Sequence, residues 1–293
     1  MHRLRIIHET EYFYHEPVSF GEHIAMIRPR EGHDLHIDKA ILRIEPRASI
    51  RWLRDIYGNS LAVIEFHEPS AKLRIYGECE VTIYDDEPRE RIIDPRARSY
   101  PFQYAANEQM EIIPYRVPSY PHDGWAVQNW LAEIYQPGEV IPTLDLLKKL
   151  NTRIFESFQY ARREEAGVQL PCQTLALRSG SCRDFAVFMM EAARHLGFAA
   201  RFVTGYILMG EGQHGSTHAW TEIYIPGAGW KGFDPTNNKL DGFEHVSVGV
   251  AREHEKASPL TGSWSGPANA FSHLNVSVQV TASQETPPPW FNP

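Results

Sequence analysis

Apolar and polar residues alternate along the first third of the chain. Short runs of β-branched and aromatic residues are interleaved with charged residues and separated by proline, glycine or asparagine. A period of two is typical of strands that bury one face, and Tyr57-Gly58-Asn59-Ser60 has the composition of a tight hairpin turn. The pattern predicts strands at residues 4–14, 40–44, 49–55, 61–66 and 73–84, the last ended by Pro88. We expect an antiparallel sheet or sandwich.

Prolines become frequent between residues 94 and 121. Proline donates no backbone hydrogen bond and fixes its own φ, so we expect a connector without a regular helix or ladder. The predicted organisation is a β-rich domain at residues 1–93, a connector at 94–121, and a core with a C-terminal strand and tail at 122–293. The tail contains Pro287-Pro288-Pro289.

Beyond the connector, apolar residues recur at helical spacing. The first two sets are Trp125, Val127, Trp130, Leu131 and Ile134, then Leu144, Leu147, Leu150, Ile154 and Phe158. A third set, with one apolar face, is Phe185, Phe188, Met189, Ala192 and Leu196, and Gly197 ends it. Mixed with further strands, these helices predict an α+β protein.

Composition excludes several classes of protein. The 293 residues are 42% hydrophobic and 23% charged, which suits a chain that folds without disulfides or metal. A net charge of −8 gives no field that attracts nucleic acid. We find no apolar stretch long enough for a secretory signal or a membrane span. We therefore expect a soluble, cytoplasmic protein without nucleic-acid or membrane partners. Its oligomeric state is left open.

The three cysteines, Cys79, Cys172 and Cys182, are few and odd in number. This favours a reducing compartment and leaves at least one thiol free. Cys79 falls in a predicted strand and Cys172 in a predicted loop, and we interpret both as structural.

Cys182 stands at the first position of the predicted third helix. Ser181 suits the N-cap, and Asp184 completes a capping box. Unpaired backbone N–H groups and the positive end of the helix dipole favour the nucleophilic thiolate there, and the same N–H groups could stabilise an oxyanion. The alternative is an inert buried thiol, since free cysteine is among the most buried residue types.

A second candidate region is the hairpin between residues 217 and 237. Residues 217–225 have strand composition, a Pro-Gly-Ala-Gly turn follows, and residues 230–234 form the return strand. His218 and Asp234 share a face only if paired residue numbers have an even sum, as when Tyr224 opposes Trp230. We predict that register, or a bulge. Taken alone, His218 is better explained as a packed histidine and Asp234 as a turn-forming aspartate. Together with Cys182 they supply the base and the orienting carboxylate that acyl transfer by a thiol requires.

Three blocks, residues 180–206, 217–224 and 229–237, together resemble the transglutaminase-like superfamily, in its bacterial branch identified as cysteine proteases. The strand-rich front resembles the N-terminal domain of that branch. The resemblance implies a papain-like core whose cysteine helix packs on an antiparallel sheet. It implies Cys182 as nucleophile, His218 as general base and acid, and Asp234 as the residue that orients His218.

The implied activity is cleavage of peptide or isopeptide amides in a peptide or protein substrate, through a thioester. Two alternatives stay open: a transamidase that crosslinks proteins, and a binding module that keeps the fold without turnover. No cofactor is implied. The 14 histidines lack the paired spacing of a zinc site, so we expect no metal.

Overall fold

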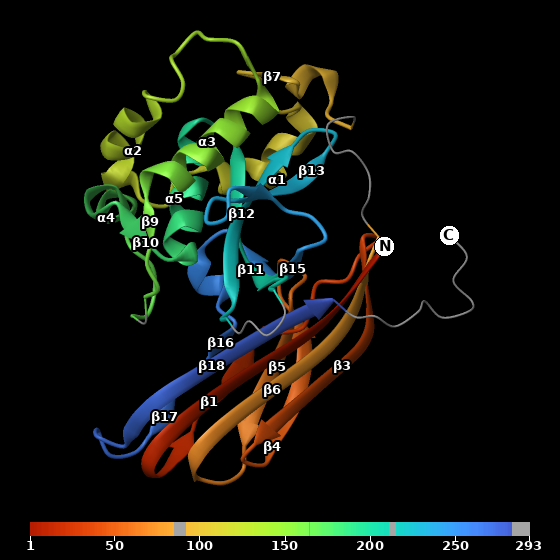
Figure 1. The fold of residues 1–293 in the computed structure, drawn as a ribbon, viewed down its shortest axis with the longest axis vertical. Coiled ribbons are helices and arrows are strands. Elements are labelled where there is room, and N and C mark those ends of the chain that lie inside the picture. The colour runs from red at the N-terminus through yellow and green to blue at the C-terminus, as the bar shows by residue number, and fades with distance from the viewer. Residues whose placement is uncertain (85–91, 164, 211–214, 283–293) are drawn as a thin grey trace.

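The computed structural model describes residues 1–84, 92–163, 165–210 and 215–282. Figure 1 shows two parts, an elongated pair of β-sheets and, above them, a group of helices around a shorter sheet. The predictions about Pro88 and about Pro287-Pro288-Pro289 lie outside the described residues. The α+β fold class is confirmed: antiparallel sheets and helices are mixed, with a β domain at the N-terminus.

The lower part consists of two antiparallel sheets. The larger has the order β17-β1-β6-β3, with β18 also paired to β1, and the smaller has the order β16-β2-β5-β4. The strands of the larger sheet are β1 (His2–Phe20), β3 (Leu35–Glu45), β6 (Ser70–Ile83), β17 (Trp264–Ser265) and β18 (Phe271–Ala282). Those of the smaller are β2 (His23–Ala25), β4 (Ala48–Arg54), β5 (Ser60–Phe66) and β16 (Leu260–Thr261).

The predicted strands of this part are confirmed. The turn between β4 and β5 falls at the expected residues, where Gly58 has φ +75° and Asp55 Oδ1 accepts the N–H groups of Tyr57 and Asn59. Strand β2 is only three residues long, and the alternation did not predict it. Along β1 the period of two buries Leu4 and Ile6 against the core's Val246 and Val248, so one face of this sheet carries the second part.

The last strand is not part of the core sheet. β18 pairs with β1 from Leu4↔Ala282 to Tyr14↔Phe271, although we expected it within residues 122–293 as part of the core. The physical reason is the apolar alternation of Val278 and Val280, which buries both side chains in the same cluster as Leu4. β1 thereby gains a partner on its open side.

The upper part has a five-stranded antiparallel sheet of order β14-β13-β12-β11-β15. Its strands are β11 (Ala199–Ile207), β12 (His218–Ile225), β13 (Gly229–Asp234), β14 (Lys239–Leu240) and β15 (His245–Ala251). Its helices are α1 (Ala106–Arg116), α2 (Gly124–Leu131), α3 (Thr143–Ser157), α4 (Pro171–Leu177) and α5 (Cys182–His195). Four two-residue strands form two further pairs: β7 (Ser99–Tyr100) with β8 (Ile141–Pro142), and β9 (Gln159–Tyr160) with β10 (Ser179–Gly180).

Helix α5 is central, and the prediction of a single buried face was wrong. Its polar residues Asp184, Glu191 and Arg194 are buried as well. The Arg194 side chain, fully buried, lies 3.0 Å from Glu191, which itself accepts the N–H groups of Ser119 and Tyr120. Paired charges tolerate burial, so the helix can be enclosed on all sides.

The connector contains a helix, contrary to the prediction. α1 can form because no proline lies between Pro101 and Pro114. The helix includes Pro114 near its C-terminal end. Glu108 accepts the Ala105 N–H at its start, and Ile112 packs beside Ala199 of the core sheet.

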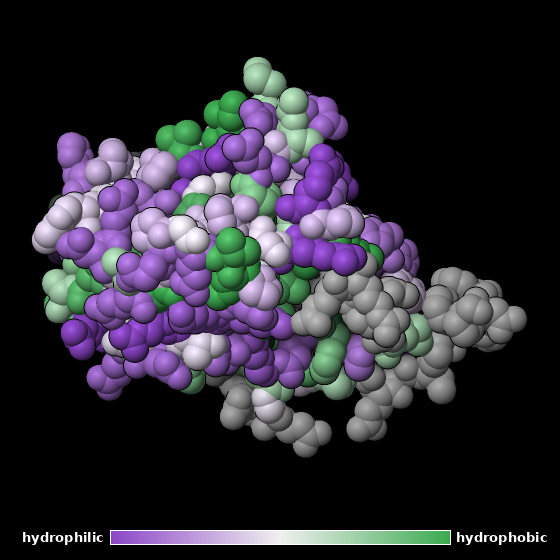
Figure 2. Space-filling model, turned by 90° about the horizontal axis from the view of Figure 1, so that it is seen from above, coloured by the Kyte–Doolittle hydropathy of each residue, from purple (hydrophilic) through white to green (hydrophobic). Residues whose placement is uncertain are grey.

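The helical end of the molecule has a mixed surface. Figure 2, which views the molecule from the helical end, shows hydrophobic side chains in separate groups among hydrophilic ones. Within the described ranges, no helix is both long and apolar enough to cross a membrane. The cytoplasmic location stays a prediction.

Candidate active site

Cys182 begins helix α5, as the capping pattern predicted. Asp184 Oδ2 accepts the Ser181 backbone N–H at 2.7 Å and its hydroxyl at 2.8 Å. The other oxygen of Asp184 accepts Arg163 at 2.7 Å. The helix is tied to β12 where Thr221 Oγ1 donates to the Ala186 carbonyl. These bonds hold the Cys182 thiol at the N-terminus of α5, beside β12.

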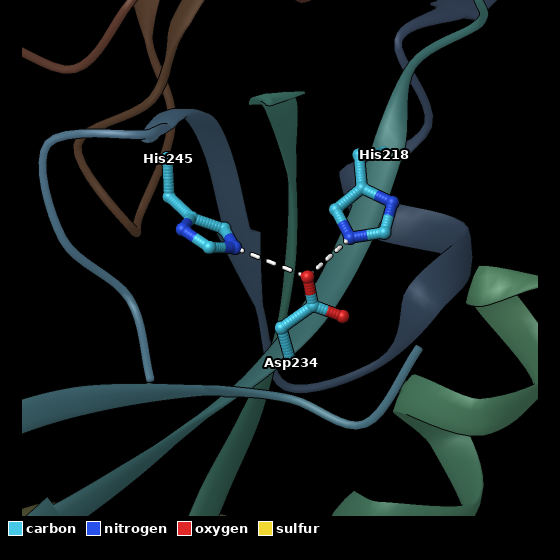
Figure 3. Close-up of side chains that lie close together, drawn as sticks. All are labelled: His218, Asp234 and His245. Atoms are coloured by element: carbon cyan, nitrogen blue, oxygen red, sulfur yellow. Dashed lines mark hydrogen bonds and ion pairs between the residues drawn. The ribbon is translucent and has the colours of Figure 1, made fainter. Parts of the chain in front are cut away.

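The hairpin has the predicted register. Tyr224 pairs with Trp230 and Thr221 with Phe233, so His218 and Asp234 lie on the same face. His218 Nε2 is 2.8 Å from Asp234 Oδ2, and Figure 3 shows the two side chains pointing toward each other from β12 and β13. The structure thus brings these two residues together.

Every hydrogen bond that the structure gives the Asp234 carboxylate is accepted by it. Oδ1 accepts the backbone N–H groups of Thr236 and Asn237, and Oδ2 accepts His218, His245 and the Asn237 amide. Burial raises the pKa of Asp234, but bonds from His218 and His245 outweigh it and hold this pKa well below its usual range. The carboxylate is therefore ionised.

Cys182 and His218 line the same cavity, and the two side chains interact electrostatically. Because Asp234 occupies Nε2, Nδ1 is the ring nitrogen left to face the thiol. Burial lowers the pKa of His218, but Asp234 and Cys182 together raise it to about 10. His218 is therefore an imidazolium at neutral pH.

His245 is a member of this cluster that the sequence did not reveal. Its Nε2 lies 3.1 Å from Asp234 Oδ2 (Figure 3). Since a carboxylate oxygen only accepts, both histidines carry a proton on Nε2. His245 Nδ1 is buried and has no hydrogen-bond partner among the described residues. A histidine opening an apolar strand was the only clue, and nothing in the spacing relates it to Asp234.

Gly205 makes the approach of His245 possible. It pairs with His218 on one side and with Ser247 on the other. A Cβ at Gly205 would lie 2.2 Å from the Val246 carbonyl oxygen and 2.6 Å from the Trp220 ring. Only glycine lets β15 come this close.

The same three side chains could be considered as metal ligands. His218, Asp234 and His245 offer ligand atoms within 4.8 Å of one another. Both Nε2 atoms, however, already donate protons to the carboxylate oxygen, which satisfies these three ligand atoms without an ion. We interpret the cluster as a hydrogen-bond network.

An open cavity of about 830 Å³ exposes this site. Cys182, His218 and Tyr160 line one wall, together with Arg162 and Arg183. Residues 271–274 and 276 of β18 line the same cavity. Both parts of the molecule therefore contribute to the space in front of the thiol.

The other two cysteines lie away from this cavity and are also free. Burial raises the pKa of Cys79, in β6, to about 11. Cys172 was wrongly expected in a loop: it is the second residue of α4, because Pro171 suits a first helical position. Burial and Asp123 raise its pKa too.

Comparisons with known proteins show the family of this chain. Residues 4–82 match the bacterial transglutaminase-like N-terminal region, and residues 135–235 match the transglutaminase-like superfamily. An uncharacterized protein of Mycobacterium tuberculosis is 27% identical over 95% of this chain and 92% of its own length. One from Mycobacterium leprae is 23% identical, over 96% and 99%.

A solved structure has the same fold. The crystal structure of a putative cysteine protease from Cytophaga hutchinsonii superposes with a TM-score of 0.73 at 19% identity, covering 99% of this chain and 94% of that one. Two family models thus match on either side of the connector, and the fold agrees over nearly the whole length. The chain belongs to the transglutaminase-like superfamily of thiol enzymes, with a bacterial transglutaminase-like N-terminal region in front of the core.

Proposed function

We propose that this protein is a thiol-dependent acyl-transfer enzyme that hydrolyses peptide or isopeptide amide bonds, with Cys182 as nucleophile, His218 as acid and base, and Asp234 orienting His218. The observation that carries the proposal is the hydrogen bond of His218 to the buried carboxylate of Asp234, with Cys182 beside His218 in the wall of the same open cavity. A nucleophile, a base and an orienting group in this order are what thioester chemistry requires.

In this mechanism, the Cys182 thiolate attacks the amide carbonyl carbon. The N–H groups of the first turn of α5 have no intrahelical acceptor and can stabilise the oxyanion. As the C–N bond breaks, the proton on His218 Nδ1 passes to the departing amine, which leaves a thioester. His218 then accepts a proton from water as its oxygen attacks the thioester. The C–S bond breaks, the acid is released, and thiolate and imidazolium are restored.

The first prediction concerns the three thiols. Iodoacetamide at mildly acidic pH is expected to alkylate Cys182 at least about tenfold faster than Cys79 or Cys172, because the imidazolium of His218 stabilises a thiolate. Burial and raised pKa values keep the other two protonated. Peptide mass spectrometry over time measures the three rates. Equal rates would contradict an activated thiol at Cys182.

The second prediction concerns pH. Because the folded pKa of His218 is raised to about 10, the imidazolium is present below that pH and lost above it. We expect kcat/KM on a cleaved peptide to fall as pH rises through about 10, with circular dichroism showing that the fold persists. A fall centred near the ordinary imidazole pKa of about 6.5 would contradict the proposed role of Asp234.

The acceptor of the acyl group decides between hydrolysis and crosslinking. Peptide profiling with wild type and Cys182→Ala, with and without an added primary amine, separates these reactions by product mass. Loss of peptide only with wild type, with free acid as product, supports the proposal. Amine incorporation would make the enzyme a transamidase, and no turnover of any peptide would favour the binding module.

A further inference from the structure

β18 has one paired edge and one edge that is mostly open. β1 pairs with it along one side, and on the other side Gly215 exchanges two backbone hydrogen bonds of 2.9 Å with Val278. In an antiparallel ladder, alternate residues direct their N–H and C=O groups to the same side. Leu274 and Val276 therefore present theirs on the side of Gly215, where the described chain gives them no backbone partner.

This open edge borders the cavity in front of Cys182. Leu274 and Val276 line the same space as Cys182 and His218, and Figure 1 shows β18 running beneath the end of the core sheet. Leu274 is 44% exposed. An unpaired strand edge with exposed side chains is a template for a further strand.

The chain itself already uses part of this edge. Gly215 precedes β12 by only a few residues, so the segment that leads to His218 first forms an antiparallel bridge with β18. An extended peptide beside Val276 and Leu274 would continue the same ladder past Gly215. Its next residues would lie in the cavity that contains the thiol.

The charges around the cavity favour an acidic occupant. Arg162, Arg163 and Arg183 line it, and Glu255 is the one carboxylate among the described lining residues. Arg163 is neutralised by Asp184, and Glu255 lies 3.3 Å from His254. Arg162 is exposed, and the structure gives it no ion pair within the described ranges.

We propose that the free edge of β18 at Leu274 and Val276 binds the substrate as an added antiparallel strand, and that this strand carries acidic side chains toward Arg162. The inference rests on the proposed peptide-cleaving function. It assigns substrate binding to the larger sheet of the lower part, to which β18 belongs. Backbone bonds provide the affinity, and Arg162 provides the preference for acidic residues.

Proline at an outward-facing position tests the strand. In Val276→Pro the lost N–H points to the open edge, so the ladder with β1 keeps its bonds. We expect kcat/KM on acetylated hexapeptides to fall about tenfold or more, since one N–H is lost and the ring blocks the edge. Ala282→Pro is the matched control. The N–H of Ala282 lies on the same edge but remote from the cavity, so we expect kcat/KM to stay unchanged. Equal activity of Val276→Pro and wild type would overturn the proposal.

A binding measurement separates this inference from the proposed function. Amide hydrogen exchange in full-length Cys182→Ala should show protection of Leu274 and Val276 when an aspartate-containing hexapeptide is added, and less with the lysine-containing analogue. Protection without cleavage by wild type would support the docking edge and refute the hydrolase. Cleavage by wild type, with exchange at both amides unchanged in Cys182→Ala, would refute the docking edge alone. A lysine peptide protecting as well as the aspartate peptide would overturn the acidic preference.

Discussion

Replacing Asp234 by asparagine is expected to lower kcat/KM on a cleaved peptide by about 10³- to 10⁴-fold. Asp234 accepts every bond made to it, from His218, His245, Asn237 and two backbone N–H groups. Whichever way the new amide is turned, its NH₂ group faces N–H donors. His218 would lose both its orientation and the charge that raises its pKa, so the alkaline limb of the pH profile should move to lower pH.

Asn237→Ala is the matched control for this experiment. It removes one neutral donor, 2.7 Å from the same oxygen, and leaves the charge in place, so the expected loss is about tenfold or less. His245→Asn removes another donor to Asp234. Its loss of kcat/KM should lie between those of Asn237→Ala and Asp234→Asn. The rate of Cys182 alkylation at mildly acidic pH reports the thiol–imidazole pair independently of turnover. Asp234→Asn with more than a tenth of wild-type activity would refute the proposed role.

Replacing Glu191 by alanine is expected to lower the free energy of unfolding by about 3–5 kcal/mol, because it leaves a buried cation without its partner. Burial lowers the pKa of Arg194 to about 10 even beside Glu191. Glu191 also accepts the backbone N–H groups of Ser119 and Tyr120, which would lose these bonds. Urea denaturation monitored by fluorescence measures the change.

Glu133→Ala is the matched control for that variant. Glu133 pairs with Arg153 at 2.8 Å, but both side chains are about half exposed, and an exposed pair contributes about 0–1 kcal/mol. Adding Arg194→Met to Glu191→Ala removes the unpaired charge and should restore part of the stability. A Glu191→Ala variant as stable as Glu133→Ala would show that the pair is not needed.

Local patterns predicted the parts of this protein that depend on neighbours in sequence. The start of α5 at Cys182 follows from a capping residue and its acidic partner three positions on. The period of two limited the registers in which His218 and Asp234 share a face, and the structure has the even-sum register that we predicted as the alternative to a bulge. These rules act over a few residues, so they can be applied without knowledge of the fold.

The predictions that were wrong concern features that depend on residues far apart in the chain. Helix α5 was expected to bury one face, yet Arg194 is enclosed because carbonyls of Tyr115 and Arg252 reach it from separate segments. Glu191, one turn earlier in the helix, supplies the carboxylate. The connector was expected to lack a helix, yet α1 is stabilised by packing on β11. Tertiary contacts outweighed local propensity in both cases.

The sequence by itself determined the α+β class and the thiol at a helix start, and it allowed His218 to meet Asp234 in one of the possible registers, because capping and strand alternation are local. Only the tertiary structure decided that His245 joins Asp234 and that β18 lies on β1 beside the cavity. Both depend on which strands become neighbours. Apolar faces decide which strands become neighbours. Alternation in the sequence shows that such a face is buried, but it does not show which other face packs against it.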